Sequence, residues 1–181
     1  MKLDKLSPRD EDGAVRVVVE SPRGSPVKLK YEPELGAFTL SRPLVLGVHY
    51  PFDWGFVPGT RAPDGDPLDA MVLLDACTYP GVVLEGRPVG VVEITQRAEG
   101  GDGRERNDRL VVAPSKAPRF DGLRDARDLP ARVREEIEAF FRAAVLLEEK
   151  GLELLGWGGP DEAEEVLEAA IRAASRKGKA A

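Results

Sequence analysis

The sequence predicts a single, mainly β domain of the α+β class, in which a small barrel precedes two helices. Short β-branched or apolar segments, separated by Pro and Gly turns, fill the first two-thirds of its 181 residues. Short strands at this spacing are typical of a small barrel. The last third instead repeats its apolar residues at helical spacing. Because 42% of the residues are apolar, the chain can bury a core of ordinary size.

Five segments are predicted to be strands because β-branched or apolar residues are dense in most of them. They are Val15–Glu20, Ala37–Leu40, Ala70–Leu74, Arg87–Thr95 and Leu110–Ala113. Turn signals separate these segments, among them Pro58-Gly59 and Pro80-Gly81.

Two helices are predicted in the last third, both covering the barrel from outside. The first has one apolar face, because the following residues recur at helical spacing: Val133, Ile137, Phe140, Phe141, Ala144 and Leu147. The second runs from about Asp161 to Arg176, with acids near its start and bases near its end, as the helix dipole favours. We expect residues 1–13 and 177–181 to be flexible.

Charge and composition argue against several classes of function. A formal net charge of -6 disfavours nucleic acid, whose phosphates attract a basic face. No apolar stretch reaches the roughly 20 residues that span a bilayer, and the charged first residues lack the apolar run of a signal peptide. The single cysteine, Cys77, excludes an intramolecular disulfide and is expected to be a buried thiol. We therefore predict a cytoplasmic protein that binds neither nucleic acid nor membranes.

Three carboxylates lie close together in residues 64–69, Asp-Gly-Asp-Pro-Leu-Asp. The Gly and Pro favour a turn, which can direct Asp64, Asp66 and Asp69 toward one point. Three converging negative charges repel one another unless cations lie among them. Oxygen ligands of this kind suit Mg²⁺ or Mn²⁺. The alternative is an ordinary Asp-Gly turn with solvated acids, which is common in proteins.

The same segment resembles the signature of the family I inorganic pyrophosphatases, Asp-x-Asp-Pro-hydrophobic-Asp. Residues 16–22, 28–37 and 50–58 also resemble family motifs in the family's order, and the resemblance extends from about Val15 to Trp157. It implies a five-stranded, OB-like closed barrel with helices packed outside, two of them C-terminal. It further implies hydrolysis of pyrophosphate to two phosphates with Mg²⁺ or Mn²⁺ and assembly as a homo-oligomer, a hexamer in bacterial-type members.

The resemblance assigns metal binding to a group of carboxylates. Asp64 and Asp69 would be metal ligands, and Asp66 would be the base or the orienter of the attacking water. Glu20 would contact metal-bound water. The family's next aspartate aligns with Asn107, so we expect Asp108, or Asp102 by a local shift, to be the third ligand.

Phosphate binding is assigned by the same resemblance to Lys28 and Arg42, whose donors suit phosphate oxygens. Tyr50 would donate a hydrogen bond to phosphate or to a neighbouring side chain. Lys30 stands where the family has an acid, and Arg109 where it has a lysine. We expect both of these cations to bind substrate.

Several further positions depart from the family pattern. Trp54 replaces a tyrosine, Gln96-Arg97 replaces an Asp-Glu pair, and Ala144-Val145 replaces a Tyr-Lys pair on the helix. Lys150 lies further along and is not expected to reach the site. We hypothesise that the site holds one or two metal ions, with Lys30, Arg97 and Arg109 as substitute cations. The alternative is drift, in which the new charges point into solvent.

Two classes of function therefore stay open. The first is a metal-dependent pyrophosphatase, whose activity is either complete or weakened or altered in specificity by the replaced residues. The second is a degenerate member that binds pyrophosphate or another phosphorylated ligand, or acts on a different phosphorylated metabolite. Retention of Asp66 favours catalysis, because a protein that only binds has no need of a water-activating base.

Overall fold

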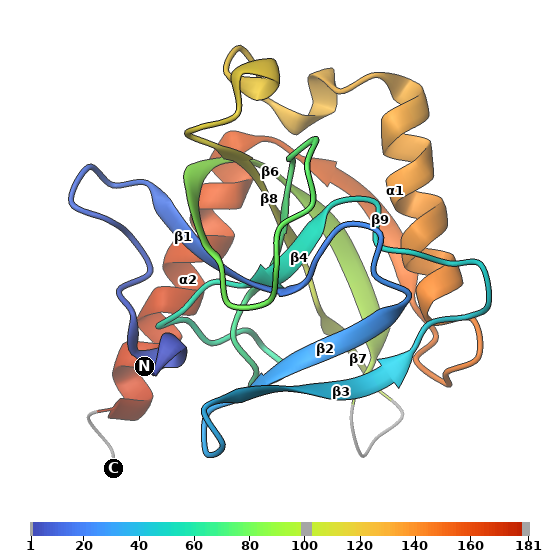
Figure 1. The fold of residues 1–181 in the computed structure, drawn as a ribbon, viewed down its shortest axis with the longest axis horizontal. Coiled ribbons are helices and arrows are strands. Elements are labelled where there is room, and N and C mark those ends of the chain that lie inside the picture. The colour runs from blue at the N-terminus through green and yellow to red at the C-terminus, as the bar shows by residue number, and fades with distance from the viewer. Residues whose placement is uncertain (1, 99–102, 179–181) are drawn as a thin grey trace.

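The computed structural model describes residues 2–98 and 103–178, which form a mainly β structure with two α-helices (Figure 1). The strands are β1 (Val15–Ser21), β2 (Val27–Glu32), β3 (Ala37–Pro43), β4 (Asp53–Phe56), β5 (Asp69–Val72), β6 (Val83–Arg97), β7 (Arg104–Arg106), β8 (Arg109–Pro114) and β9 (Glu153–Gly158). The helices are α1 (Ala131–Ala144) and α2 (Pro160–Gly178), with short 3-10 helices at Leu3–Lys5, Pro118–Phe120 and Ala126–Asp128. No helix in the described ranges is long and apolar enough to cross a membrane.

Five strands are joined by hydrogen-bonded pairings that return to the starting strand. β1 pairs with β4, β4 with β5, β5 with β8, β8 with β6, and β6 with β1. Only the β5–β8 pairing among these is parallel. β7 and β9 extend the sheet by pairing with β6, and β2 and β3 form a separate hairpin in front of it (Figure 1). Each of the five strands is therefore hydrogen-bonded to two of the others.

Successive residues of the central strands pack against different helices. Val91 of β6 lies in one buried cluster with Leu167 of α2, whereas Val92 lies in another with Ile137 of α1. β8 alternates in the same way. This follows from strand geometry, because neighbouring side chains point to opposite faces. The predicted apolar faces of both helices are thus buried, and α1 and α2 lie on different sides of the strands (Figure 1).

β4 approaches β1 unusually closely at Gly55. A Cβ atom at this position would lie 1.8 Å from the carbonyl oxygen of Val18. Both backbones are held by strand pairing, so a side-chain rotation could not relieve the contact. The sequence does not predict β4 as a strand, because Pro and Gly surround it. The strand nevertheless carries Trp54 into the core beside α1.

Some predicted boundaries and burials are wrong. α1 ends at Ala144, where Val145 leaves helical geometry with φ -118° and ψ 12°. Leu147, predicted to be on the buried face, is 82% exposed. The turn after the helix instead carries Glu148 to an ion pair with Arg42 of β3. Cys77 is exposed rather than buried, since it lies in the loop after β5.

The N-terminal segment, predicted to be flexible, has defined contacts with the rest of the chain. Leu3 is buried, and the Arg9 guanidinium pairs with Glu164 at 2.5 Å and Glu168 at 3.0 Å on α2. At the other end α2 extends to Gly178, so part of the predicted flexible tail is helical. Residues 179–181 lie outside the described part of the chain.

Candidate active site

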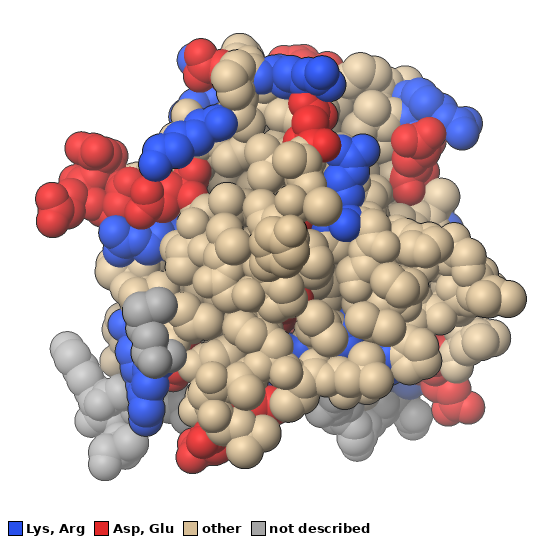
Figure 2. All heavy atoms as spheres, in the orientation of Figure 1, with Lys and Arg blue, Asp and Glu red and all other residues tan. Residues whose placement is uncertain are grey.

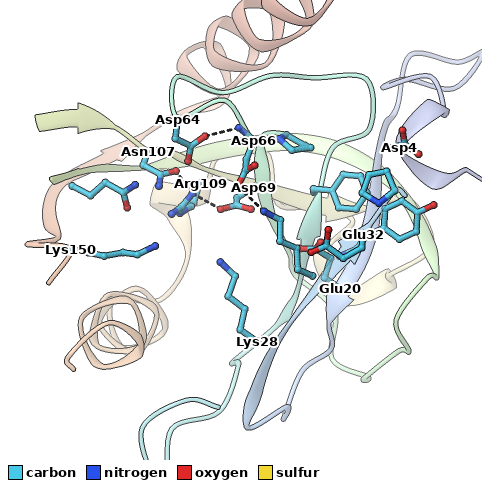
Figure 3. Close-up of a pocket in the computed structure, with 16 residues that line it drawn as sticks. Asp4, Glu20, Lys28, Glu32, Asp64, Asp66, Asp69, Asn107, Arg109 and Lys150 are labelled. Atoms are coloured by element: carbon cyan, nitrogen blue, oxygen red, sulfur yellow. Dashed lines mark hydrogen bonds and ion pairs between the residues drawn. The ribbon is translucent and has the colours of Figure 1, made fainter. Parts of the chain in front are cut away.

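A cavity of about 500 Å³ lies between β2, the loop that precedes β5, and the start of β8 (Figure 3). Its charged lining residues are the acids Asp4, Glu20, Glu32, Asp64, Asp66 and Asp69 and the bases Lys28, Lys30, Arg109 and Lys150. Acids and bases from distant parts of the sequence are therefore mixed on one surface. Such a lining can hold both cations and a polyanion.

The turn that contains Asp64 and Asp66 directs its carboxylates into this cavity. The backbone N–H of Gly65 donates to the carbonyl of Ala62 at 3.0 Å, and Gly65 has φ +90°, a conformation that glycine tolerates best. The N–H of Asp66 donates to the Asp64 carboxylate at 3.1 Å. Asp69 follows as the first residue of β5 and also lines the cavity. The structure thus brings the three carboxylates to one cavity, as their spacing predicts.

Two of these carboxylates are paired with cationic side chains. Lys30 Nζ lies 3.1 Å from Asp66 Oδ2, and Arg109 Nη1 lies 2.5 Å from Asp69 Oδ2 (Figure 3). Within residues 2–98 and 103–178, no three Asp, Glu, His or Cys side chains are gathered as a complete metal-binding group. Burial raises the pKa of Asp64, which the neighbouring Asp69 raises further. The donors fit a hard divalent cation by their chemistry, and such a cation would relieve this repulsion.

Glu20 is a buried acid in the wall of the cavity. Its carboxylate accepts a 2.7 Å hydrogen bond from the N–H of Tyr31. Burial raises the pKa of Glu20 to about 7, and Asp69 also raises it, whereas the hydrogen bond, Lys28 and Lys30 act in the opposite direction. Glu20 therefore changes its charge near neutral pH.

Glu20→Gln is expected to stabilise the metal-free protein at pH 8. The pKa of Glu20 is 4.5 when unperturbed and about 7 when folded, so the folded state loses relative stability as pH rises from 4.5 through 7. The amide stays neutral and can still accept from Tyr31. A shift of this size corresponds to about 3 kcal/mol in the free energy of unfolding above pH 7. Urea unfolding of the variant and the wild type at pH 4.5 and pH 8, in the presence of a metal chelator, measures this difference in the free energy of unfolding.

The gain should nearly vanish at pH 4.5, where Glu20 is protonated in the folded state and already half protonated in the unfolded state. Glu34→Gln is the matched control, because Glu34 is exposed in the turn between β2 and β3. An equal effect of Glu20→Gln at the two pH values would contradict the raised pKa.

The predicted phosphate-binding residues do not all reach the cavity. Lys28 and Lys30 line it together, because residues two apart on β2 share a face. Arg42 lies opposite Lys28 in the hairpin but pairs with Glu148 and is not among the lining residues. Tyr50 is also outside the lining and packs on Phe140, with ring centroids 5.0 Å apart.

Tyr50 nevertheless lies near the carboxylates. Burial raises the pKa of its hydroxyl, and the charges of Asp69 and Glu20 raise it further. The hydroxyl is therefore protonated at neutral pH and can act as a hydrogen-bond donor.

The prediction that Asp108 is a metal ligand needs correction. Its carboxylate accepts from the N–H of Ile94 at 3.0 Å and pairs with Arg106 at 2.9 Å, outside the cavity. Asn107 and Arg109 line the cavity instead. Side chains alternate along an extended segment, so the residue between them faces away. The other candidate, Asp102, lies outside the described residues.

The same alternation corrects the prediction for Arg97. Gln96 lines the cavity, whereas Arg97, the next residue of β6, does not. Lys150, which was not expected to reach the site, does line it. The turn after α1 brings Lys150 there, and its carbonyl accepts from the N–H of Arg97. No local sequence pattern identifies Lys150 as a residue of the cavity lining, because the position of Lys150 depends on where α1 ends.

Comparisons with known proteins agree with this arrangement. The profile of the inorganic pyrophosphatase family matches residues 17–175. This chain belongs to the inorganic pyrophosphatase family. The inorganic pyrophosphatase of Synechocystis sp. is 36% identical over 172 residues, covering 95% of this chain and 98% of the relative. That of Nostoc sp. is 36% identical over 173 residues, covering 96% and 99%. The crystal structure of inorganic pyrophosphatase from Thermus thermophilus matches with a TM-score of 0.88 and 35% identity, covering 97% and 99%.

Membership of the inorganic pyrophosphatase family confirms the resemblance read from the motifs. It also gives the departures a structural context, because four of the positions that differ from the family pattern line the cavity. These are Lys30, Gln96, Asn107 and Arg109. Lys30 and Arg109 point toward the cavity and pair with Asp66 and Asp69, and whether they act there as substitute cations or result from drift stays a prediction.

Proposed function

We propose that this protein hydrolyses inorganic pyrophosphate to two phosphates with the help of divalent cations held by Asp64 and Asp69. The observation that carries the proposal is the meeting of the three signature carboxylates with Lys28 in one cavity. The inorganic pyrophosphatases of two cyanobacteria and of Thermus thermophilus, which match nearly the whole chain, support it.

The chain's own residues can perform distinct parts of this reaction. Asp66, which is 62% exposed at the cavity, can orient water and accept its proton. Lys28, Lys30 and Arg109 can bind the phosphate oxygens through charged hydrogen bonds. A divalent cation, Mg²⁺ or Mn²⁺, would supply stabilisation of the phosphate charge and a lower pKa for water.

Arg42 and Tyr50 have supporting roles in this proposal. Arg42 lies opposite Lys28 in the β2–β3 hairpin, where its positive charge favours an anion in the cavity. The Tyr50 hydroxyl keeps its proton and donates a hydrogen bond near Asp69. Glu20 lies in the wall of the cavity, where its carboxyl group would contact water bound to the metal ion.

Purified protein is expected to release two phosphates per pyrophosphate when Mg²⁺ or Mn²⁺ is present. A chelator should abolish the release, because without the cation the pKa of the attacking water is no longer lowered. A colorimetric phosphate assay measures the rate, with inactivated protein as the blank. Pyrophosphate that binds in calorimetry but is not hydrolysed under any of these conditions would contradict the proposal and identify a phosphate-binding protein.

We also propose that the strand circuit is the OB-like closed barrel of the family, and that the protein assembles as a homo-oligomer, a hexamer, in the cytoplasm. The face shown in Figure 2 supports assembly, since few charged side chains lie over its middle. Residues 43–52 contain no Lys, Arg, Asp or Glu, and Leu46 there is fully exposed. Uncharged exposed surface of this kind is typical of contacts between subunits.

A further inference from the structure

The basic side chains that line the cavity differ in how far their charge is already neutralised. Two of them, Lys30 and Arg109, face carboxylates of the signature at 3.1 Å and 2.5 Å. Lys28 forms no ion pair within the described part of the chain. There the ammonium group of Lys150 approaches only Glu148, at 4.0 Å, which is longer than a hydrogen bond. Lys28 and Lys150 therefore keep the most positive charge for an incoming anion.

Lys28 and Lys150 reach the cavity from different elements. Lys28 lies on β2, whereas Lys150 lies in the turn that follows α1. Figure 3 shows the two side chains extending from these elements, with their ammonium groups pointing into the cavity. An anion that fills the cavity would thus meet one free cation on each of two walls.

The turn that carries Lys150 is anchored to several strands. The carbonyl of Lys150 accepts from the N–H of Arg97 on β6 at 2.8 Å. Arg104 on β7 donates to the carbonyl of Gly151 at 2.9 Å, and Glu148 forms an ion pair with a side chain of β3. The backbone at Lys150 is therefore held, while its side chain is 44% exposed and accessible to a ligand. A cation at a fixed backbone position loses less freedom on binding than one on a mobile loop.

The two separate cations match the two charged ends of a diphosphate. An ammonium group binds phosphate oxygens as a compact point charge, so each lysine can hold one phosphate group. A single phosphate can be bound by either lysine alone. A diphosphate can engage both lysines at once, and it loses this advantage when the bond between its two phosphates is broken.

We propose that Lys150 is a substrate-binding residue that holds one end of the diphosphate while Lys28 holds the other, so that the cavity selects diphosphates over single phosphate groups. This inference rests on the proposed function, because it concerns the substrate of the same cavity. It adds a residue that no sequence motif identifies, and it gives each product phosphate a weaker hold than the substrate.

Calorimetry at a fixed Mg²⁺ concentration tests this inference without any assay of activity. The two ligands are methylenediphosphonate, a diphosphate analogue that is not hydrolysed, and methylphosphonate, which has a single phosphonate group. Lys150→Met is expected to weaken binding of the diphosphonate by about ten- to hundredfold, as expected for the loss of one charged hydrogen bond. Its affinity for methylphosphonate should stay near that of the wild type, because Lys28 still binds this ligand.

Two further variants serve as controls. Lys150→Arg keeps the positive charge and should bind the diphosphonate nearly as well as the wild type does. Lys116→Met is the matched control, because Lys116 is exposed in the turn after β8 and does not line the cavity. Its affinity for both ligands should equal that of the wild type.

Two results would overturn the inference. An unchanged affinity for the diphosphonate in folded Lys150→Met would show that Lys150 does not contact the ligand. Equal losses for the two ligands would show that Lys150 only adds to the general positive potential of the cavity. Circular dichroism checks the fold, and if Lys150→Met is unfolded, Lys150→Gln is judged by the same two criteria.

These measurements also separate the inference from the proposed function. A wild type that binds the diphosphonate through Lys150 but releases no phosphate from pyrophosphate would refute the proposed hydrolysis alone. A wild type that hydrolyses pyrophosphate, with a Lys150→Met variant that binds both ligands normally, would refute the role of Lys150 alone.

Discussion

Asp69→Asn is expected to lower the rate of pyrophosphate hydrolysis by about 10³-fold and to remove most of the affinity for divalent cations. Asp69 opens β5, whose backbone is held by β4 on one side and β8 on the other, so its carboxylate has a fixed position. An amide of the same shape removes the charge that a cation needs. It also leaves Arg109 without its anionic partner, which makes the site more repellent to cations.

Phosphate release and Mn²⁺ binding should therefore be lost together in this variant. Asp75→Asn is the matched control, because Asp75 pairs with Arg119 away from the cavity and should keep both properties. Thermal unfolding checks that the Asp69 variant is folded. A folded variant with an unaltered rate would show that hydrolysis occurs elsewhere or without Asp69.

The parts of the site that lie in one short segment could be predicted from sequence. Residues 64–69 lie around a single turn, which was expected to gather their carboxylates. The strand β2, which gives Lys28 and Lys30 a common face, was not among the predicted strands. The position of Lys150 could not be predicted, because it depends on the end of α1 and on a backbone contact with β6. The error for Asp108 has a different origin, since one residue of shift along an extended segment reverses the direction of a side chain.

Helical periodicity identified the two helices, and dense β-branched or apolar residues identified β1, β3, β5, β6 and β8, whereas β2, β4, β7 and β9 were not predicted. β4 is short and surrounded by Pro and Gly, and its pairing with β1 depends on a close approach at Gly55 that only the folded structure shows. β9 follows α1 and precedes α2 along the chain, and it is stabilised by its pairing with β6. Such strands form because a partner is available, which a single-sequence pattern does not show.

Asp66→Asn should separate catalysis from metal binding. Asp66 lines the cavity with its side chain 62% exposed, and its Oδ2 pairs with Lys30, whereas Asp69 pairs with Arg109. An exposed ion pair of this kind contributes at most about 1 kcal/mol to stability, so the variant should fold normally. The amide can still hold water by a hydrogen bond, but it cannot accept a proton.

The turnover rate of Asp66→Asn is therefore expected to fall by about 10²–10³-fold, within the range typical for loss of a general base, while Mn²⁺ affinity stays near that of the wild type. Glu32→Gln removes another carboxylate from the same cavity and controls for the change in local charge. Steady-state phosphate release and Mn²⁺ titration on the same preparations measure the two effects. If Asp66→Asn loses metal affinity in parallel with rate, Asp66 is a ligand rather than the base. If neither changes, the proton is accepted by another group, and the buried carboxylate of Glu20 is the next residue to substitute.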